Sequence, residues 1–169
     1  MTDIPSHVVN VDEAKEVDFT LGDCWGGIDK PLTPSMRAKG GRLGVTLSRV
    51  PPGRTMCPFH FHEREDEVFF IVSGRGVLRY GEDVRELRAG DCVSCPAGTK
   101  VAHQIANPFA EDLTYLAIGP HDPHEVAVYP DSGKVMVRSL GQVGFLQKAP
   151  YLQAEPVPPR IFDLAKGCR

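Results

Sequence analysis

The stretch PFHFHEREDEVFFIVSGRG, residues 58–76, decides the fold. It holds His60 and His62 one residue apart, then five charged residues, five apolar residues and two glycines. In an extended chain successive side chains point to opposite faces, so the two histidines share a face with Cα atoms roughly 6.6 to 7 Å apart. Two imidazoles placed in this way can bind one metal ion.

Glu67 is the acidic residue that can join the two histidines, but only if the chain bends before it. It lies an odd number of residues from both His60 and His62, so on one unbroken strand it would face away from them. The charged segment EREDE must therefore contain a turn or a bulge. We predict a break in the strand between residues 63 and 66.

In the run VFFIV, residues 68–72, the odd-numbered and the even-numbered positions are all apolar, so both faces of a strand formed here would be apolar. A strand with one solvated face would alternate apolar and polar residues, so we expect both faces of this strand to be buried. One face can line the interior of the protein, and the other needs a second sheet, an N-terminal arm or another copy of the chain. A homodimer is the simplest cover, and we predict one.

Short strand-like runs separated by turn residues fill the middle of the chain. From residue 43 they are LGVTLSRV, EVFFIV, VLRY, VREL, CVSC, HQIAN, LTYLAIG, HEVAVYP and KVMVRSL, and the turns draw on 17 Gly and 15 Pro. This pattern predicts an all-β antiparallel sandwich or barrel. The candidate helices are single turns near residues 12–16 and 160–166.

A length of 169 residues fits one domain that buries its own core. We expect residues 1–41 to form an N-terminal arm packed on the barrel, because they lack helical periodicity and regular strand patterning. Residues 42–140 form the barrel. Residues 141–169 are a Pro-rich C-terminal tail that packs on the body or on a second subunit.

The segment GDCVSCPAGTKVAHQIAN, residues 90–107, supplies a further candidate ligand in His103. Three imidazoles and one carboxylate suit a divalent transition metal: Fe, Mn, Ni, Co or Zn. Four protein ligands on an octahedral ion leave two positions for water, substrate or O2. A His-x-His pair alone also occurs by chance on strand faces, so the prediction depends on the full set of His60, His62, Glu67 and His103.

Two segments carry a resemblance to the cupin superfamily. Residues 53–76 resemble its first motif through Gly53, His60, His62, Glu67 and Gly74, and residues 90–107 resemble its second through Gly90, Pro96, Gly98, His103 and Asn107. Each approach loop is slightly long, with six residues between Gly53 and His60 and four between Gly98 and His103. The resemblance implies a jelly-roll β-barrel with one metal ion in its mouth, bound by the four ligands, and often a homodimer.

The cupin fold carries many reactions, so the resemblance alone does not select one. The chain is similar to small stand-alone cupins that are compared with sugar phosphate isomerases, and we expect a metal-dependent isomerase or lyase. The alternatives are a non-haem Fe(II) dioxygenase and a non-catalytic metabolite-binding protein. No residue is assigned as catalytic, and no organic cofactor is expected.

A small polar, anionic metabolite is the expected ligand, because a divalent ion with one carboxylate ligand keeps a formal charge of about +1. Arginines near the motifs can clamp a carboxylate or phosphate. Most of them are expected at the surface, with Arg49 and Arg79 ahead of Arg54, Arg64 and Arg75 because these two lie in predicted strands.

Net charge and segment composition bear on partners and location. The net charge is −3 with scattered basic residues, which predicts no nucleic-acid partner and no membrane-binding patch. The longest apolar run has five residues and the first residues do not resemble a secretory signal, so we expect a cytoplasmic protein.

The remaining cysteines and histidines are expected to be structural or exposed. Five cysteines in a chain of this length indicate mostly free thiols. Cys92 and Cys95 are three residues apart and should face opposite sides of a strand, and Cys57 is interpreted as a packing thiol. His121 and His124 lie between prolines and are expected in solvent.

Overall fold

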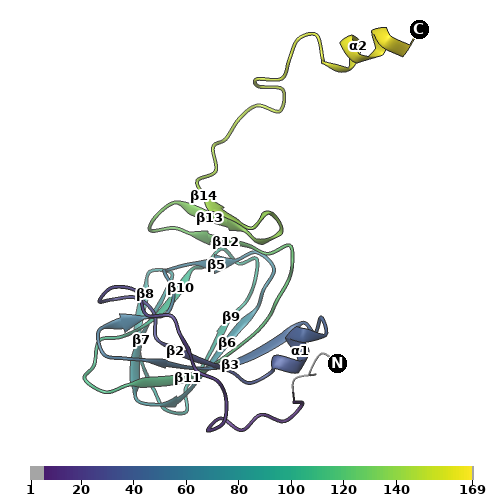
Figure 1. Ribbon diagram of the computed structural model, residues 1–169. Coiled ribbons are helices and arrows are strands. Elements are labelled where there is room, and N and C mark those ends of the chain that lie inside the picture. The colour runs from purple at the N-terminus through teal and green to yellow at the C-terminus, as the bar shows by residue number, and fades with distance from the viewer. Residues whose placement is uncertain (1–5, 169) are drawn as a thin grey trace.

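The structure, a computed structural model, describes residues 6–168 as three antiparallel sheets with few helical turns (Figure 1). The first sheet has six strands, in the order β1 (Val17–Asp18), β2 (Ile28–Pro31), β3 (Leu43–Val50), β11 (Leu113–Pro120), β6 (Glu67–Ser73) and β9 (Cys92–Cys95). The second has four, in the order β4 (Arg54–Thr55), β10 (His103–Asn107), β7 (Arg75–Tyr80) and β8 (Asp83–Arg88). The third is β14 (Gln142–Gly144), β13 (Lys134–Val137), β12 (Val126–Tyr129) and β5 (Phe61–His62).

The helical elements are short and lie outside the sheets. They are α1 (Pro34–Ala38), the 3-10 turn η1 (Arg138–Leu140), α2 (Ile161–Leu164) and the 3-10 turn η2 (Ala165–Cys168). The turn predicted near residues 160–166 is confirmed. The one predicted near residues 12–16 is wrong, because the chain there forms hydrogen-bonded turns without a helix.

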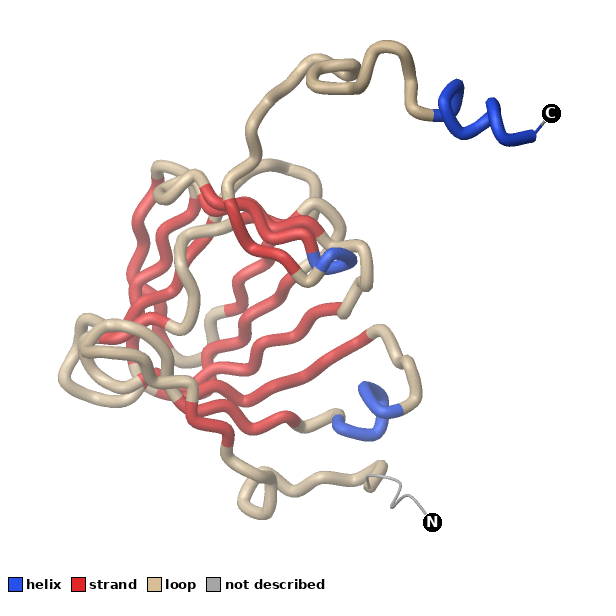
Figure 2. Tube along the Cα trace, turned by 45° about the horizontal axis from the view of Figure 1, so that its top comes forward, coloured by secondary structure: helices blue, strands red, loops and turns tan. Residues whose placement is uncertain are grey.

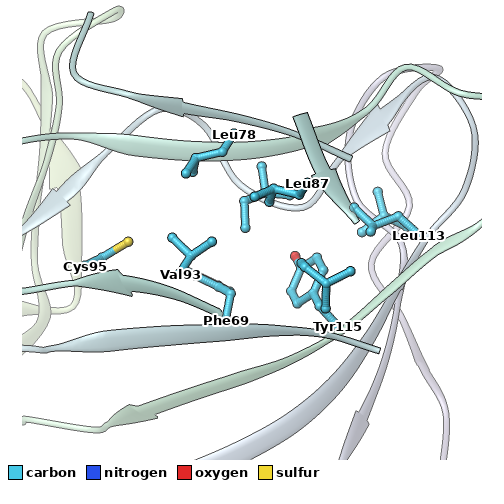
Figure 3. Packing of buried hydrophobic residues seen from close by; sticks show 10 residues of the cluster. Phe69, Leu78, Leu87, Val93, Cys95, Leu113 and Tyr115 are labelled. Carbon is cyan, nitrogen blue, oxygen red and sulfur yellow. The ribbon is translucent and has the colours of Figure 1, made fainter. Parts of the chain in front are cut away.

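The hydrophobic core lies between the first sheet, which has six strands, and the second sheet, which contains β7 and β8. Side chains of Phe69, Val93 and Tyr115 from the first sheet meet Leu78 and Leu87 from the second (Figure 3). Each strand contributes the residues of one parity, as the period of two requires. The sheets thus pack face to face as a jelly roll, and the all-β prediction is confirmed.

The strand boundaries follow the sequence pattern closely. All nine runs read as strands between residues 43 and 140 are strands, and β3 and β10 have the predicted limits. The N-terminal segment does more than lie on the body, because β2 pairs along β3 with Asp29 opposite Ser48. Residues of the segment 1–41 therefore extend the six-stranded sheet.

The prediction that both faces of the VFFIV strand are buried is wrong within one chain. Phe69 and Ile71 face the core and are buried, whereas Phe70 is 40% exposed and Val72 is 45% exposed. The N-terminal segment adds strands at the edge of this sheet, so it does not cover the outer face at these two side chains. The exposed side chains lie on the surface that a second copy would have to cover.

The C-terminal segment runs away from the sheets after β14 (Figures 1 and 2). Its apolar side chains are exposed, including Phe145, Tyr151 and Phe162. It does not pack on the body of its own chain. Among residues 6–168, no helix combines the length and the apolar character needed to cross a bilayer.

Gly74 connects β6 to β7 and provides a stability test. Its φ is +77°, and a Cβ there would lie 2.2 Å from the Asp112 carbonyl oxygen. We expect Gly74→Ala to lower the free energy of unfolding by about 2 to 3 kcal/mol, because it adds a backbone clash to the strain of a positive φ. Denaturant titration measures this loss.

Gly133→Ala is the matched control for Gly74→Ala. Gly133 has a φ of +71°, but an added Cβ meets nothing within 4 Å. Its substitution should cost only the left-handed strain, about 1 kcal/mol. Equal losses for the two variants would contradict the role given to the Asp112 contact.

Candidate metal centre

His60 and His62 lie on the extended segment that ends in β5. The backbone N–H of His60 donates to the His103 carbonyl at 3.1 Å, and the N–H of His103 donates to the His60 carbonyl at 2.8 Å. This pairing brings the His60 ring to 4.8 Å from the His62 ring and 4.7 Å from the His103 ring, between centroids. Residues 43 positions apart in the sequence thus form one imidazole cluster.

Glu67 is the first residue of β6, and its carboxylate lies among the three rings. Its Oε2 is 2.8 Å from Nε2 of His103, 3.3 Å from Nε2 of His62 and 3.7 Å from Nε2 of His60. Ligand atoms of His60, His62 and Glu67 all lie within 4.8 Å of one another. The structure therefore brings together all four residues that the sequence singled out.

A hydrogen bond at the far side of the His60 ring fixes which of its nitrogens faces the centre. His60 Nδ1 lies 2.7 Å from the Pro58 carbonyl oxygen, so Nδ1 carries the proton and Nε2 has a free lone pair. Both ring nitrogens of His62 and Nδ1 of His103 are buried without a hydrogen-bond partner among the described residues. Buried polar atoms are rarely left unpaired, so this donor set fits a bound cation.

Charge interactions shift the ionisation of two members of the cluster. Burial acts to raise the pKa of Glu67, but the hydrogen bond with His103 and the close approach of the His60 and His62 rings outweigh it and hold that pKa well below its usual range. Burial acts to lower the pKa of His62, but the neighbouring carboxylates outweigh it and the pKa rises. Protons thus compete with a metal ion for His62.

The predicted break between residues 63 and 66 is confirmed, and Glu125 holds it. β5 ends at His62 and β6 begins at Glu67. The Glu125 carboxylate is fully buried and accepts hydrogen bonds from the backbone N–H of Glu63 at 2.9 Å and of Arg64 at 3.1 Å. Its Oε1 also lies 3.3 Å from Nδ1 of His62. One carboxylate therefore shapes the turn and faces the outer nitrogen of a candidate ligand.

Glu65 and Arg138 form a second support behind the same turn. Glu65 is 4% exposed, and Arg138 pairs with both of its carboxylate oxygens, with Nη2 donating to Oε2 at 2.8 Å. Ligand atoms of His62, Glu65 and Glu125 also lie within 4.8 Å of one another. Because the guanidinium and two backbone N–H groups already satisfy these carboxylates, we interpret them as supports of His62.

A cavity of about 160 Å³ lies beside His60, Glu67 and His103. Its other lining residues are Asp29, Thr46, Ser48, Met56, Cys57, Phe69, Gln104, Ile105, Tyr115 and Ala117. Of the described residues that line it, none is Arg or Lys. A small ligand beside the candidate ligands would thus meet hydroxyl, amide, thiol and carboxyl groups.

Arg49 and Arg79, the two arginines ranked first as possible ligand clamps, pair with carboxylates outside the cavity. The Arg49 guanidinium pairs with Asp112 at 3.2 Å, and the Arg79 guanidinium pairs with Asp131 at 2.7 Å. Neither residue lines the cavity, because each alternates with strand neighbours that face the interior: Ser48 and Val50 beside Arg49, and Leu78 beside Arg79. The strand parity of the two residues, which the sequence pattern left open, decides this result.

A larger groove of about 660 Å³ adjoins the cavity. The two share Asp29, Thr46, Glu67 and Ala117, so these residues stand at their junction. Arg42 and His121 line the outer groove. His121 and His124 are both exposed, as expected.

The cysteines follow the sequence prediction with one exception. Cys92 is exposed and Cys95 is buried, so they face opposite sides of β9. Cys57 was expected as a packing thiol, but it is exposed and lines the cavity. Cys57 lies three residues before His60, in the segment that precedes β5, and this position places it at the cavity wall.

Sequence comparison places most of this site within one domain family. Residues 46–119 match the cupin domain, a segment that contains all four candidate ligands. An oxalate-binding protein from Thermotoga maritima is 37% identical over 71 residues, which are 41% of this chain and 55% of the relative. The chain spans about half the length of the curated relatives it matches.

Solved structures show the same fold. A cupin-superfamily sugar phosphate isomerase from Silicibacter pomeroyi is 26% identical with a TM-score of 0.69, over 83% of this chain and 92% of that protein. A predicted oxalate decarboxylase from Thermotoga maritima is 25% identical with a TM-score of 0.57, over 67% of this chain and 97% of that protein. The shared feature of these relatives is the barrel, and their described activities differ.

Proposed function

This chain is a small protein of the cupin superfamily, and we propose that it is a metal-dependent isomerase or lyase acting on a small polar metabolite. The observation that carries the proposal is the convergence of three histidine Nε2 atoms on one Glu67 oxygen at the edge of a cavity. We propose His60, His62, Glu67 and His103 as ligands of one divalent transition metal. The ion would polarise a carbonyl or stabilise an enediolate of the substrate.

The chain's own groups would orient the substrate and exclude water. Phe69, Ile105 and Ala117 form apolar parts of the cavity wall, which keep the site small. A ligand pocket is usually 300 to 1,000 Å³, so a cavity of about 160 Å³ holds only part of a metabolite. We propose that the remainder lies in the outer groove, where Arg42 and His121 favour a negatively charged substituent.

Two other functions differ in the use of the open positions on the metal. A non-haem Fe(II) dioxygenase would need O2 to bind there, and a binding protein would need no turnover. The cavity favours neither of these specifically. Its polar wall, with Asp29, Gln104 and Tyr115, suits a hydroxyl-bearing substrate.

Metal analysis combined with oxygen uptake separates the three functions. The purified protein is assayed for bound metal, then for O2 consumption and product formation with a panel of keto acids and sugar phosphates. Zinc, nickel or manganese with turnover and no O2 uptake is the expected result. Iron with O2 uptake would favour the dioxygenase, and thermal stabilisation by a ligand without turnover would favour binding alone.

A homodimer in the cytoplasm is part of this proposal. The exposed Phe70 and Val72 on the outer face of the six-stranded sheet support a second copy as its cover. Size-exclusion chromatography with light scattering should give twice the chain mass of 18.5 kDa. A particle of the single-chain mass would contradict it.

A further inference from the structure

Asp29 lies at the junction between the outer groove and the cavity beside the candidate metal ligands. It is one of four residues common to the groove and the cavity, and of these four only Asp29 and Glu67 carry a charged group. Glu67 is engaged by the three histidines. The Asp29 carboxyl is therefore the free acidic group at the junction among the described residues.

The local structure of the sheet explains how Asp29 enters the cavity. Asp29 lies on β2 opposite Ser48 of β3, and both side chains point to the inner face of the sheet. The Ser48 hydroxyl donates to Oδ1 of Asp29 at 2.6 Å. The described residues give this carboxylate no other hydrogen bond, so its remaining lone pairs are available to a ligand.

The chemistry of this wall favours a hydroxyl group over a second anion. A carboxylate accepts hydrogen bonds from hydroxyl groups and repels other carboxylates. The described lining of the cavity has no Arg or Lys to offset that repulsion. Burial also raises the pKa of the Asp29 carboxyl, with the Ser48 hydrogen bond offsetting part of the effect.

We infer that Asp29, held by Ser48, is a specificity residue that binds a neutral hydroxyl group of the ligand beside the metal and disfavours dianions such as oxalate. The inference rests on the proposed function only in taking a metal to be bound by the four proposed ligands. The substrate class is then a molecule with a metal-chelating oxygen pair that includes a hydroxyl, such as a hydroxy acid or a hydroxy ketone. A negative substituent, if present, lies further out in the groove.

Oxalate and glycolate form a matched pair of probes, because glycolate replaces one carboxylate of oxalate with a CH2OH group. Their affinities for the Zn(II)-reconstituted full chain are measured by calorimetry, and retained zinc is checked after each titration. We expect Asp29→Asn to raise the ratio of oxalate to glycolate affinity by about tenfold or more, because a like charge is removed from the cavity. Ser48→Ala keeps the carboxylate and should leave the ratio within about threefold of the wild-type value.

Asp112→Asn is the matched control, since Asp112 is an exposed carboxylate that pairs with Arg49 outside the cavity. It should leave the ratio unchanged. An Asp29→Asn protein that retains zinc and shows the wild-type ratio would overturn the inference, as would a wild-type protein that binds neither probe. If Asp29→Asn does not fold, the wild-type protein alone provides the test. Its ratio of oxalate to glycolate affinity should be about tenfold lower than the same ratio for aqueous Zn(II). These are binding ratios, so they remain valid if the proposed turnover is absent.

Discussion

His103→Ala is expected to abolish stoichiometric metal binding. The His103 side chain is 3% exposed, and its Nε2 lies 2.8 Å from the Glu67 oxygen on which the other two histidines also converge. Removing it leaves three ligands and an enlarged cavity that admits water, so the remaining set should no longer retain the ion through purification. Metal content per chain, measured after reconstitution and desalting, should fall from about one to below about 0.1.

The control for this variant is His124→Ala, because His124 is exposed on the loop before β12 and outside the cavity. It should retain the wild-type metal content. His62→Ala should lose the metal as His103→Ala does. Wild-type metal content in both ligand variants would mean that the ion, if any, binds elsewhere.

Glu125→Gln is expected to weaken metal binding by about 10- to 100-fold, the effect usual for a partner behind a metal-binding histidine. The carboxylate faces Nδ1 of His62 at 3.3 Å and fixes the turn through the N–H groups of Glu63 and Arg64. An amide of the same shape has one acceptor oxygen in place of two, so at least one of these buried donors loses its partner. That loss should also lower the free energy of unfolding by about 1 to 3 kcal/mol.

Two measurements separate a positioning role from a general loss of stability. Competition with a chelator gives the metal affinity, and the imidazole nitrogen chemical shifts of the metal-free protein report which nitrogen of His62 carries the proton. Glu63→Gln is the matched control, since Glu63 is exposed and only its backbone N–H is used. An unchanged metal affinity in a folded Glu125→Gln protein would show that Glu125 serves the turn alone.

Local patterns were enough to predict the strands and the break before Glu67. Alternation along residues 60–62 placed two histidines on one face, and the odd spacing to Glu67 required the break that the structure contains between β5 and β6. Turn residues separated the nine central strands, since glycine and proline act on the backbone locally. These predictions succeeded because each depends on neighbours within a few residues.

Long-range supports were outside the reach of the same reasoning. Glu125 and Arg138 lie 62 and 73 residues from the partners that they hold in the turn, Glu63 and Glu65. Their sequence neighbourhoods, HEVAVYP and KVMVRSL, read as ordinary strands. The position of Arg49 was open for a related reason, because the side of the sheet that a strand residue occupies depends on which face meets the core.

The sequence by itself determined the strands along the chain and the bend before Glu67, because these follow from backbone periodicity and turn chemistry. The full candidate ligand set, with His103, came from the resemblance to the cupin superfamily. The tertiary structure alone decided that Asp29 enters the cavity, that Glu125 stands behind His62 and that Phe70 and Val72 are left exposed. Those outcomes depend on how β2, β12 and the outer face of β6 are placed against distant strands. Pairing between segments far apart in the chain leaves no local signal in either segment.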